Sequence, residues 1–323
     1  MMKKLLIILI VILTTIPMRG EAGRDTLLVM FWNLENFFDY HDGGTGPSDR
    51  EFSSSGSRRW TKKRFYSKCD KVAKAVTWIA DKYSRMPDII GICEVENRNV
   101  LYKLLNDSIL RKYDYQIVHY DSSDKRGIDT ALLFRKSSFS LLSTSVHTPE
   151  FEGKILSTRD ILEVSLDREG GIFHFIINHH PSKFGGDKSS EGRRFSAMKK
   201  MKMVCDSLIV LNDGGNLVCM GDFNDTPDAP QFEIIEDILV NKSLDAFKRG
   251  EGTIRFQGKW DLIDMFMVSD SIADKSVMDI VQVPFLMAWD NSHPGYKPFR
   301  TYSGPRYIGG VSDHCPIVLK ILF

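Results

Sequence analysis

A short apolar segment that ends on two polar side chains does most to constrain this fold. Residues 217–220 read Leu-Val-Cys-Met, and Gly221 follows before Asp222 and Asn224. Four apolar residues bounded by a glycine are typical of a buried strand. Asp222 and Asn224 are two residues apart, so extended geometry places both side chains on one side, at the carboxyl end where open α/β sheets bind ligands. Taken alone, however, Asp-x-Asn is more often a plain turn.

Length and composition indicate a globular chain with ample material for a core. The chain has 323 residues, of which 42% are hydrophobic and 26% charged. Its formal net charge of +1 argues neither for nor against a nucleic-acid partner, because a polyanion site can come from local clustering. No stable protein partner is implied.

The N-terminus has the pattern of a secretory signal. Lys3 and Lys4 precede an apolar run over 5–16, and small residues follow around Gly20. The run is short for a membrane span, which favours a cleaved signal over 1–22 and export to the periplasm or the outside. An uncleaved anchor is the alternative. Residues 23–323 are then expected to form one catalytic domain.

The cysteines show no metal-binding pattern. The chain has five, an odd number, without a Cys-x-x-Cys pair or a matching histidine spacing, which argues against zinc. Most are expected to be buried thiols. They are Cys69, Cys93, Cys205, Cys219 and Cys315.

Apolar runs and periodic stripes alternate along the rest of the chain. Strands are predicted at 26–32, 89–93, 115–119, 130–134, 140–146, 161–166, 172–177, 217–220, 261–268 and 317–322. Helices are predicted over 65–83, 100–110, 195–211 and 232–239. Strands followed by a flanking helix occur twice. The simplest arrangement is an α/β fold, a four-layer α/β/β/α sandwich of two mixed β-sheets flanked by helices.

Acidic, amide and imidazole side chains follow the predicted strands at or just after their carboxyl ends. One such end is ordinary, since chains turn in water, but a repeated set is harder to dismiss. The set comprises Asn33, Glu94, His179, Asp222 with Asn224, Asp264, and Asp313 with His314.

Six short motifs around these residues resemble the endonuclease/exonuclease/phosphatase family, in the family's order and across the chain after the signal. Each is weak alone. They are Trp32-Asn33-x-Glu35-Asn36, Gly91-Ile92-Cys93-Glu94-Val95, Asn178-His179, Gly221-Asp222-Phe223-Asn224, Ile263-Asp264 and Ser312-Asp313-His314. The resemblance implies the four-layer sandwich, a divalent metal and cleavage of phosphate esters.

The resemblance also implies a metal site made of oxygen ligands. Glu94 and Asp313 would hold the ion, with Asn33 as a neutral neighbour and Glu35 as a candidate for a second position. Hard carboxylate oxygens suit Mg²⁺, with Mn²⁺ and Ca²⁺ as alternatives.

The remaining residues would carry the catalytic chemistry. His314 would be the general base or a transition-state partner, oriented by Asp264. His179 would donate to a phosphate oxygen or to the leaving group. Asp222 and Asn224 would position the water and the phosphate. Which group takes the proton stays open.

Two of these assignments have competitors in the sequence. His180 neighbours His179, and the resemblance, not spacing, selects His179. Asp261 competes with Asp264 as partner of His314, and the two face opposite ways if the strand is regular, because they lie three apart. Asp261 is expected to cap the entry to the strand.

Several cationic and hydroxyl side chains are candidates for substrate binding. Arg159 precedes a strand and could clamp a phosphate with two hydrogen bonds, or form a surface ion pair. Ser182 and Lys183 could also contact phosphate. Arg126 and Asp129 precede another strand, and a site role cannot be separated from a loop salt bridge.

Substrate class divides the hypotheses. The first is an exported, metal-dependent phosphodiesterase, an endonuclease on DNA or RNA, supported by the motifs and by the basic clusters at 58–64 and 193–194. The cluster at 58–64 has two interpretations: the start of a solvated helix, which is favoured, and a phosphate-backbone contact with Trp60 as a stacking ring. The second is hydrolysis of a lipid or inositol phosphate, as in sphingomyelinases or 5-phosphatases, with the loop predicted at 285–307, which is rich in proline, glycine and aromatic residues, at a membrane interface. A loop that covers the core explains this segment equally well. A non-catalytic binding protein is disfavoured, because every aligned catalytic position holds the expected residue type.

Overall fold

The computed structural model describes residues 26–44, 46–169, 171–183, 187–211 and 215–323. The secretory signal predicted at residues 1–22 lies outside these ranges. No helix within them combines the length and the apolarity needed to cross a membrane. The division into a signal and one catalytic domain over 23–323 stays a prediction.

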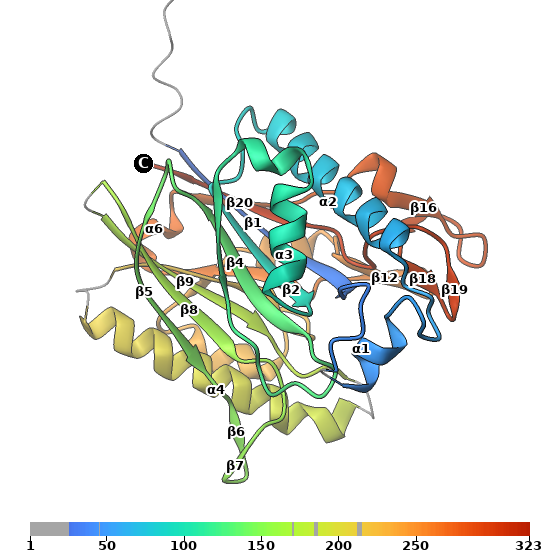
Figure 1. The fold of residues 1–323 in the computed structure, drawn as a ribbon. Helices are drawn as coiled ribbons and strands as arrows, with labels where there is room; N and C mark the ends of the chain where they lie inside the picture. The colour runs from blue at the N-terminus through green and yellow to red at the C-terminus, as the bar shows by residue number, and fades with distance from the viewer. Residues whose placement is uncertain (1–25, 45, 170, 184–186, 212–214) are drawn as a thin grey trace, which may run out of the picture.

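Two six-stranded mixed sheets dominate the described residues (Figure 1). The first has the order β15 (Ser276–Ile280), β20 (Ile317–Leu322), β1 (Thr26–Phe37), β2 (Ile89–Val95), β4 (Asp129–Arg135) and β3 (Tyr115–His119). The second has the order β11 (Val240–Asn241), β14 (Asp264–Val268), β10 (Asn216–Asp222), β9 (Gly171–His179), β8 (Ile161–Arg168) and β5 (Ser140–His147).

Helices cover the outer faces of the sheets. Helices α2 (Lys62–Lys82) and α3 (Arg98–Asn106) lie over the first sheet and α4 (Asp187–Leu211) over the second (Figure 1). The predicted four-layer sandwich is therefore confirmed. The shorter helices are α1 (Pro47–Glu51), α5 (Leu244–Lys248) and α6 (Asp270–Ala273), and the 3-10 helices are η1 (Ile109–Lys112), η2 (Pro230–Ile235) and η3 (Pro284–Leu286).

Four small hairpins lie in the connections between the larger elements of the described chain. They pair β6 (Glu150–Phe151) with β7 (Lys154–Ile155), β12 (Ile254–Phe256) with β13 (Lys259–Asp261), β16 (Met287–Trp289) with β17 (Tyr296–Pro298), and β18 (Tyr302–Ser303) with β19 (Arg306–Tyr307). The last two hairpins lie within residues 285–307, the aromatic-rich segment that was predicted to be a loop.

Three apolar layers hold the sandwich together. Strand β1 contributes to two of them, because alternate side chains point to opposite faces. Leu28 and Met30 pack toward α2, whereas Val29 and Phe31 pack against the second sheet. The third layer lies between the second sheet and α4. Such continuous apolar strands are expected where both faces of a sheet are covered.

A glycine lets neighbouring backbones of the second sheet approach closely beside the site. Gly221 lies within β10, opposite Asn178 of β9. A Cβ atom at Gly221 would lie 2.3 Å from the carbonyl oxygen of Asn178, which is too close for any side chain. The sequence placed this glycine at the end of the strand, but β10 continues to Asp222.

Two predicted elements are wrong in detail. The helix predicted over 232–239 is the shorter 3-10 helix η2, followed by a turn. Phe232 and Leu239 are both buried against α4, so their helix-like spacing arises without a continuous helix between them. The strand predicted over 261–268 is split, because the Thr253 hydroxyl accepts the N–H groups of Ile263 and Asp264 and interrupts the ladder.

All five cysteines lie in the described ranges, and all are buried with free thiols. The Sγ atoms of Cys205 and Cys219 lie 3.5 Å apart between α4 and the second sheet. The prediction of buried thiols is confirmed.

The structure decides between the two interpretations of the basic cluster at 58–64: the favoured helix start is confirmed, and the alternative, Trp60 as a stacking ring, is wrong. This ring is 1% exposed, and its Nε1 donates to the carbonyl oxygen of Phe38. Thr61 instead caps α2, because its side chain accepts the N–H of Arg64. The basic cluster is therefore the start of a helix whose aromatic residue belongs to the core.

Candidate active site

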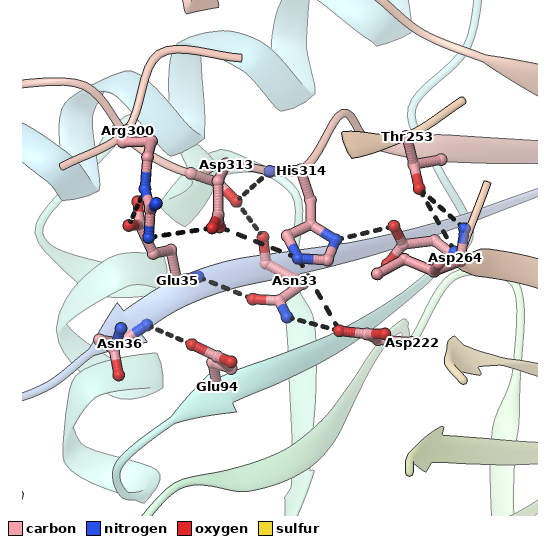
Figure 2. Close-up of polar contacts among 12 residues, drawn as sticks. Asn33, Glu35, Asn36, Glu94, Asp222, Thr253, Asp264, Arg300, Asp313 and His314 are labelled. Carbon is pink, nitrogen blue, oxygen red and sulfur yellow. Dashed lines mark hydrogen bonds and ion pairs between the residues drawn. The ribbon is translucent and has the colours of Figure 1, made fainter. Parts of the chain in front are cut away.

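Polar side chains from both sheets meet where the central strands end (Figure 2). Asn33 on β1 donates from Nδ2 to Oδ2 of Asp222 on β10, at 3.0 Å. His314 precedes β20 and lies 2.8 Å, Nδ1 to Oδ2, from Asp264 at the start of β14. Both contacts cross from the first sheet to the second. The structure thus brings together four of the residues that the sequence singled out.

His314 is held firmly by its backbone as well as its ring. Its carbonyl oxygen accepts Trp32 Nε1 at 2.9 Å, and its N–H donates to the Ser312 hydroxyl. That hydroxyl in turn donates to the carbonyl oxygen of Asn33. The Trp-Asn and Ser-Asp-His motifs therefore fix one another, although 282 residues separate Trp32 from His314.

The ring of His314 points its second nitrogen toward two carboxylates. Its Nε2 lies 3.8 Å from Asp222 Oδ2 and 3.8 Å from Asp313 Oδ1. Burial alone would lower the pKa of His314, but the neighbouring carboxylates, Asp264 first, raise it well above its usual value. Of the two aspartates that the sequence offered as partner of His314, the structure places Asp264 and not Asp261 against the ring.

Asp222 is buried and fixed by two donors. Its Oδ2 accepts Asn33 Nδ2 and its Oδ1 accepts the N–H of Asn224 at 2.9 Å. Burial raises the pKa of Asp222 to about 7, against the positive charge of His314. A carboxylate with few water contacts is a stronger proton acceptor than one in bulk solvent.

Glu94 lies near the carboxyl end of β2 in a backbone conformation that bends its side chain into the site. Its φ is +60°, and Asn36 on the parallel strand β1 has φ +50°. The pairing of β1 with β2 shifts register at this level, and Asn36 N–H donates to Glu94 Oε2 at 2.8 Å. Glu94 Oε1 lies 3.8 Å from His179 Nε2 and 3.7 Å from Arg126, so this oxygen faces the site.

His179 lies between two carboxylates. Its Nε2 is 3.7 Å from Asp222 Oδ2, in addition to its approach to Glu94. Burial, together with the charge of Arg159, lowers the pKa of His179 well below its usual value. The neighbouring His180 packs edge-on against Phe223, and its carbonyl oxygen serves as an acceptor. Between the two, His179 is the residue in the site.

The predicted substrate-binding residues occupy different surroundings. Arg159 is 6% exposed, pairs with Asp124 at 3.1 Å and donates to the carbonyl oxygen of His180, so it is no surface ion pair. Ser182 is half-buried beside it. Lys183 is 45% exposed and pairs with Asp225 at 2.8 Å.

Asn224 uses its amide within the protein. Its Nδ2 donates to the carbonyl oxygen of His180 at 2.9 Å, and its φ of +51° turns the chain after β10. In this structure Asn224 fixes the loop that carries His180. A direct contact with substrate stays a prediction.

Sequence reasoning missed two cations that organise the other edge of the site. Arg300 pairs with Glu35 Oε1 at 2.9 Å and with Asp313 Oδ2 at 3.1 Å (Figure 2). Lys68 is buried in α2 and donates to the carbonyl oxygen of Glu35 and to Thr301 Oγ1. A lysine on the apolar stripe of a helix was the signal for Lys68, whereas Arg300 lies in a loop without a motif.

Glu35 is the predicted metal residue whose oxygens are both engaged. Its Oε1 pairs with Arg300 and its Oε2 accepts the N–H of Thr301 at 2.9 Å. Burial, and then the charge of Asp313, raise the pKa of Glu35 to about 7. Glu35 could ligate a metal only by exchanging one of these partners.

The donor set fits a hard divalent cation. Among the described residues, no hydrogen bond or ion pair of Glu94 Oε1 or Asp313 Oδ1 is shorter than the 3.7–3.8 Å approaches given above. Carboxylate oxygens with a neighbouring amide are ligands that Mg²⁺ accepts. The compact three-ligand groups within the described ranges are Asp222 with Asp264 and His314, Asp222 with Cys93 and His179, and His119 with Asp121 and Asp129. None of them includes Glu94 or Asp313.

Comparisons with known proteins agree with this geometry. The model of the endonuclease/exonuclease/phosphatase family matches residues 28–322. No curated protein matches the chain. Among solved structures, truncated TDP2 of Caenorhabditis elegans is similar over 92% of this chain and 98% of its own, with 17% identity and a TM-score of 0.58.

Two further structures share the fold. A mannosyl-6-phosphatase of Bacteroides thetaiotaomicron is 15% identical with a TM-score of 0.57, over 92% of this chain and 100% of its own. The human Nocturnin catalytic domain with a bound sulfate anion is 15% identical with a TM-score of 0.55, over 92% and 94%. These likenesses show the fold, and the family match covers nearly the whole described chain. The protein therefore belongs to the endonuclease/exonuclease/phosphatase family and is a metal-dependent phosphoric ester hydrolase.

Proposed function

We propose that this protein is an exported endonuclease that hydrolyses phosphodiester bonds of DNA or RNA with a divalent metal, Mg²⁺ before Mn²⁺ or Ca²⁺. The observation that carries the proposal is the His314–Asp264 pair facing Asp222 and Asp313 beside Glu94. A phosphodiester resists water because its negative charge repels nucleophiles, so a site needs positive charge and an activated water.

The residues divide these tasks by position. Asp264 behind the ring stabilises a protonated His314, whose Nε2–H then donates to a phosphate oxygen. Asp222 lies next to that nitrogen and is the proton acceptor for the attacking water. Its partner Asn33 keeps the carboxylate oriented. A metal held by Glu94 and Asp313 would supply further positive charge to the phosphate oxygens.

His179 acts from the opposite side of Asp222. Its Nε2 faces both Asp222 and Glu94, where an imidazole N–H can donate to a phosphate oxygen or to the leaving group. Arg159 adds positive charge beside it. Negative charge that develops on phosphate is thus met by donors from both sheets.

Plasmid cleavage by residues 23–323 tests the proposal. With Mg²⁺ the wild-type chain is expected to convert supercoiled plasmid to nicked and linear forms, and His314→Ala is expected to abolish the conversion. His293→Ala is the matched control, because that ring is 45% exposed on a hairpin loop. If both the plasmid and an RNA strand stay intact across Mg²⁺, Mn²⁺ and Ca²⁺, the endonuclease is excluded.

Export rests on the sequence of residues 1–22. Fractionation of producing cells, with mass spectrometry of the mature N-terminus, is expected to find the chain outside the cytoplasm and shortened near residue 22. Full-length protein in the cytoplasm would exclude it.

A second candidate is a lipid- or inositol-phosphate hydrolase. Trp289 and Tyr296 pair edge-on at the end of the β16–β17 hairpin and are 54% and 60% exposed, as interfacial side chains are. One structural neighbour is named as a mannosyl-6-phosphatase, which supports hydrolysis of a phosphate monoester as part of this candidate. Release of choline phosphate from sphingomyelin vesicles or of phosphate from inositol polyphosphates, without plasmid cleavage, would favour this candidate.

A further inference from the structure

A cationic cavity lies beside the His179 edge of the active site, and of its lining residues only Arg159 enters the chemistry described above. It has a volume of about 370 Å³. Its walls come from the loop before β8, from the segment after β9, from α4 and from the loop before β4. The lining residues are Lys125, Leu156, Ser157, Thr158, Arg159, Pro181, Ser182 and Arg193.

The charge of the lining favours an anion. Lys125, Arg159 and Arg193 contribute three positive charges, and none of the lining residues is acidic. Asp124 pairs with Arg159 from outside the lining and offsets one of these charges. The remaining positive charge attracts a negatively charged group, more strongly at a buried position than at an exposed one.

Donors in this lining have no partner among the described residues. Arg159 Nε and Thr158 Oγ1 are buried without a hydrogen bond, although both residues are only 6% exposed. Arg193 Nε is likewise buried and unpaired. Buried donors nearly always find an acceptor, and phosphate oxygens accept guanidinium and hydroxyl donors readily.

The cavity is connected to the active site through Arg159. This side chain donates from Nη2 to the carbonyl oxygen of His180, at 2.6 Å, directly after His179. Ser182 of the lining follows two residues later, and Asn224 Nδ2 donates to the same carbonyl oxygen. A substrate whose scissile phosphate contacts His179 would therefore present its next groups to this cavity.

We propose that the cavity is a subsite for a second phosphate group of the substrate, bound next to the phosphate that is cleaved. The inference rests on the proposed function and deepens it, because it names the substrate class as a nucleic-acid strand carrying consecutive phosphates. A lone phosphomonoester would leave the cavity empty. Arg193 on α4 and Thr158 then favour longer substrates over shorter ones.

Arg193→Gln tests the subsite, and Lys199→Gln is its matched control. Lys199 is exposed on the same helix and lies outside the lining. The measurement is kcat/KM for a twelve-nucleotide strand divided by kcat/KM for bis(p-nitrophenyl) phosphate, which has one phosphate. Arg193→Gln is expected to lower this ratio about tenfold, mainly through KM, because one charge-assisted contact is lost. Lys199→Gln is expected to keep it.

Binding of pyrophosphate, measured by calorimetry on the metal-free chain, separates the two levels of the proposal. If the wild type binds pyrophosphate, Arg193→Gln weakens that binding and no nucleic acid is cleaved, the subsite stands and the endonuclease fails. If nucleic acid is cleaved but Arg193→Gln leaves both the ratio and pyrophosphate binding at wild-type values, the subsite is refuted. Equal losses in Lys199→Gln would also refute it, because they would show a general effect of charge.

Discussion

Replacement of Asp264 by asparagine isolates the orientation of His314. Asp264 Oδ2 accepts His314 Nδ1 at 2.8 Å, and both residues are at least nine-tenths buried. The amide is nearly the same size as the carboxylate but carries no charge to stabilise a protonated ring. Its NH₂ group can also turn toward Nδ1 and favour the wrong tautomer.

The size of the effect follows from the lost contact. A hydrogen bond to a charged group contributes about 1.5–3 kcal/mol. Because each 1.36 kcal/mol of barrier changes a rate about tenfold, kcat should fall roughly 10- to 150-fold. KM should change little, since Asp264 lies behind the ring and has no direct access to substrate in this geometry.

Steady-state hydrolysis of bis(p-nitrophenyl) phosphate with Mg²⁺ measures kcat and KM together. Asp261→Asn is the matched control, because Asp261 is exposed at the end of β13, three residues before Asp264, and makes no side-chain contact in the described structure with His314. Circular dichroism verifies that both variants are folded. Wild-type kcat in Asp264→Asn, or an equal loss in Asp261→Asn, would refute the role of the pair.

Three other results are expected. EDTA should abolish phosphate ester hydrolysis and Mg²⁺ should restore it, whereas activity that persists in the chelator would contradict metal dependence. Gly221→Ala should lower the free energy of unfolding by about 3 kcal/mol in urea titrations, since its Cβ would overlap the backbone of Asn178, while Gly43→Ala meets nothing closer than 3.6 Å and should be near neutral. Burial raises the pKa of Asp39, but the ion pair with Lys103 outweighs burial and lowers it below its usual value. The Asp39–Lys103 pair therefore stabilises the fold above the pKa that Asp39 has in the unfolded chain, and this stability is lost as the pH falls through its folded pKa. Asp39→Asn should therefore cost about 2 kcal/mol at pH 7, and urea titrations should show the difference shrinking below about pH 4; a constant difference would contradict this.

The strand ends could be predicted because local pattern determines them. Apolar runs that end on Glu94 or Asp222 leave few places for those side chains other than the carboxyl edge of a sheet. The helical stripe of α2 was likewise visible from spacing. The motif order then placed His314 beside Asp264, although 50 residues separate them.

The missed contacts depend on tertiary structure that no local pattern carries. Arg300 reaches Glu35 from a loop 265 residues later in the chain. Trp60 could be read as a stacking ring because its neighbours are basic, yet the ring is buried in the core, while Arg59, Lys62 and Lys63 are exposed. The sequence could not separate a site role for Arg126 from a loop salt bridge, whereas the structure places its guanidinium 3.7 Å from Glu94 Oε1.

The division of the site between two sheets makes the interior of the protein part of its catalytic apparatus. Asn33 and Glu94 belong to one sheet, and their partners Asp222 and His179 belong to the other. The apolar layer between the sheets, together with the hydrogen bonds that cross it, fixes the position of one sheet over the other, and a displacement of about one ångström would exceed the tolerance of a hydrogen bond. Ageing, heat or a substitution deep in that layer can thus abolish activity although every polar residue of the site is still present in the sequence.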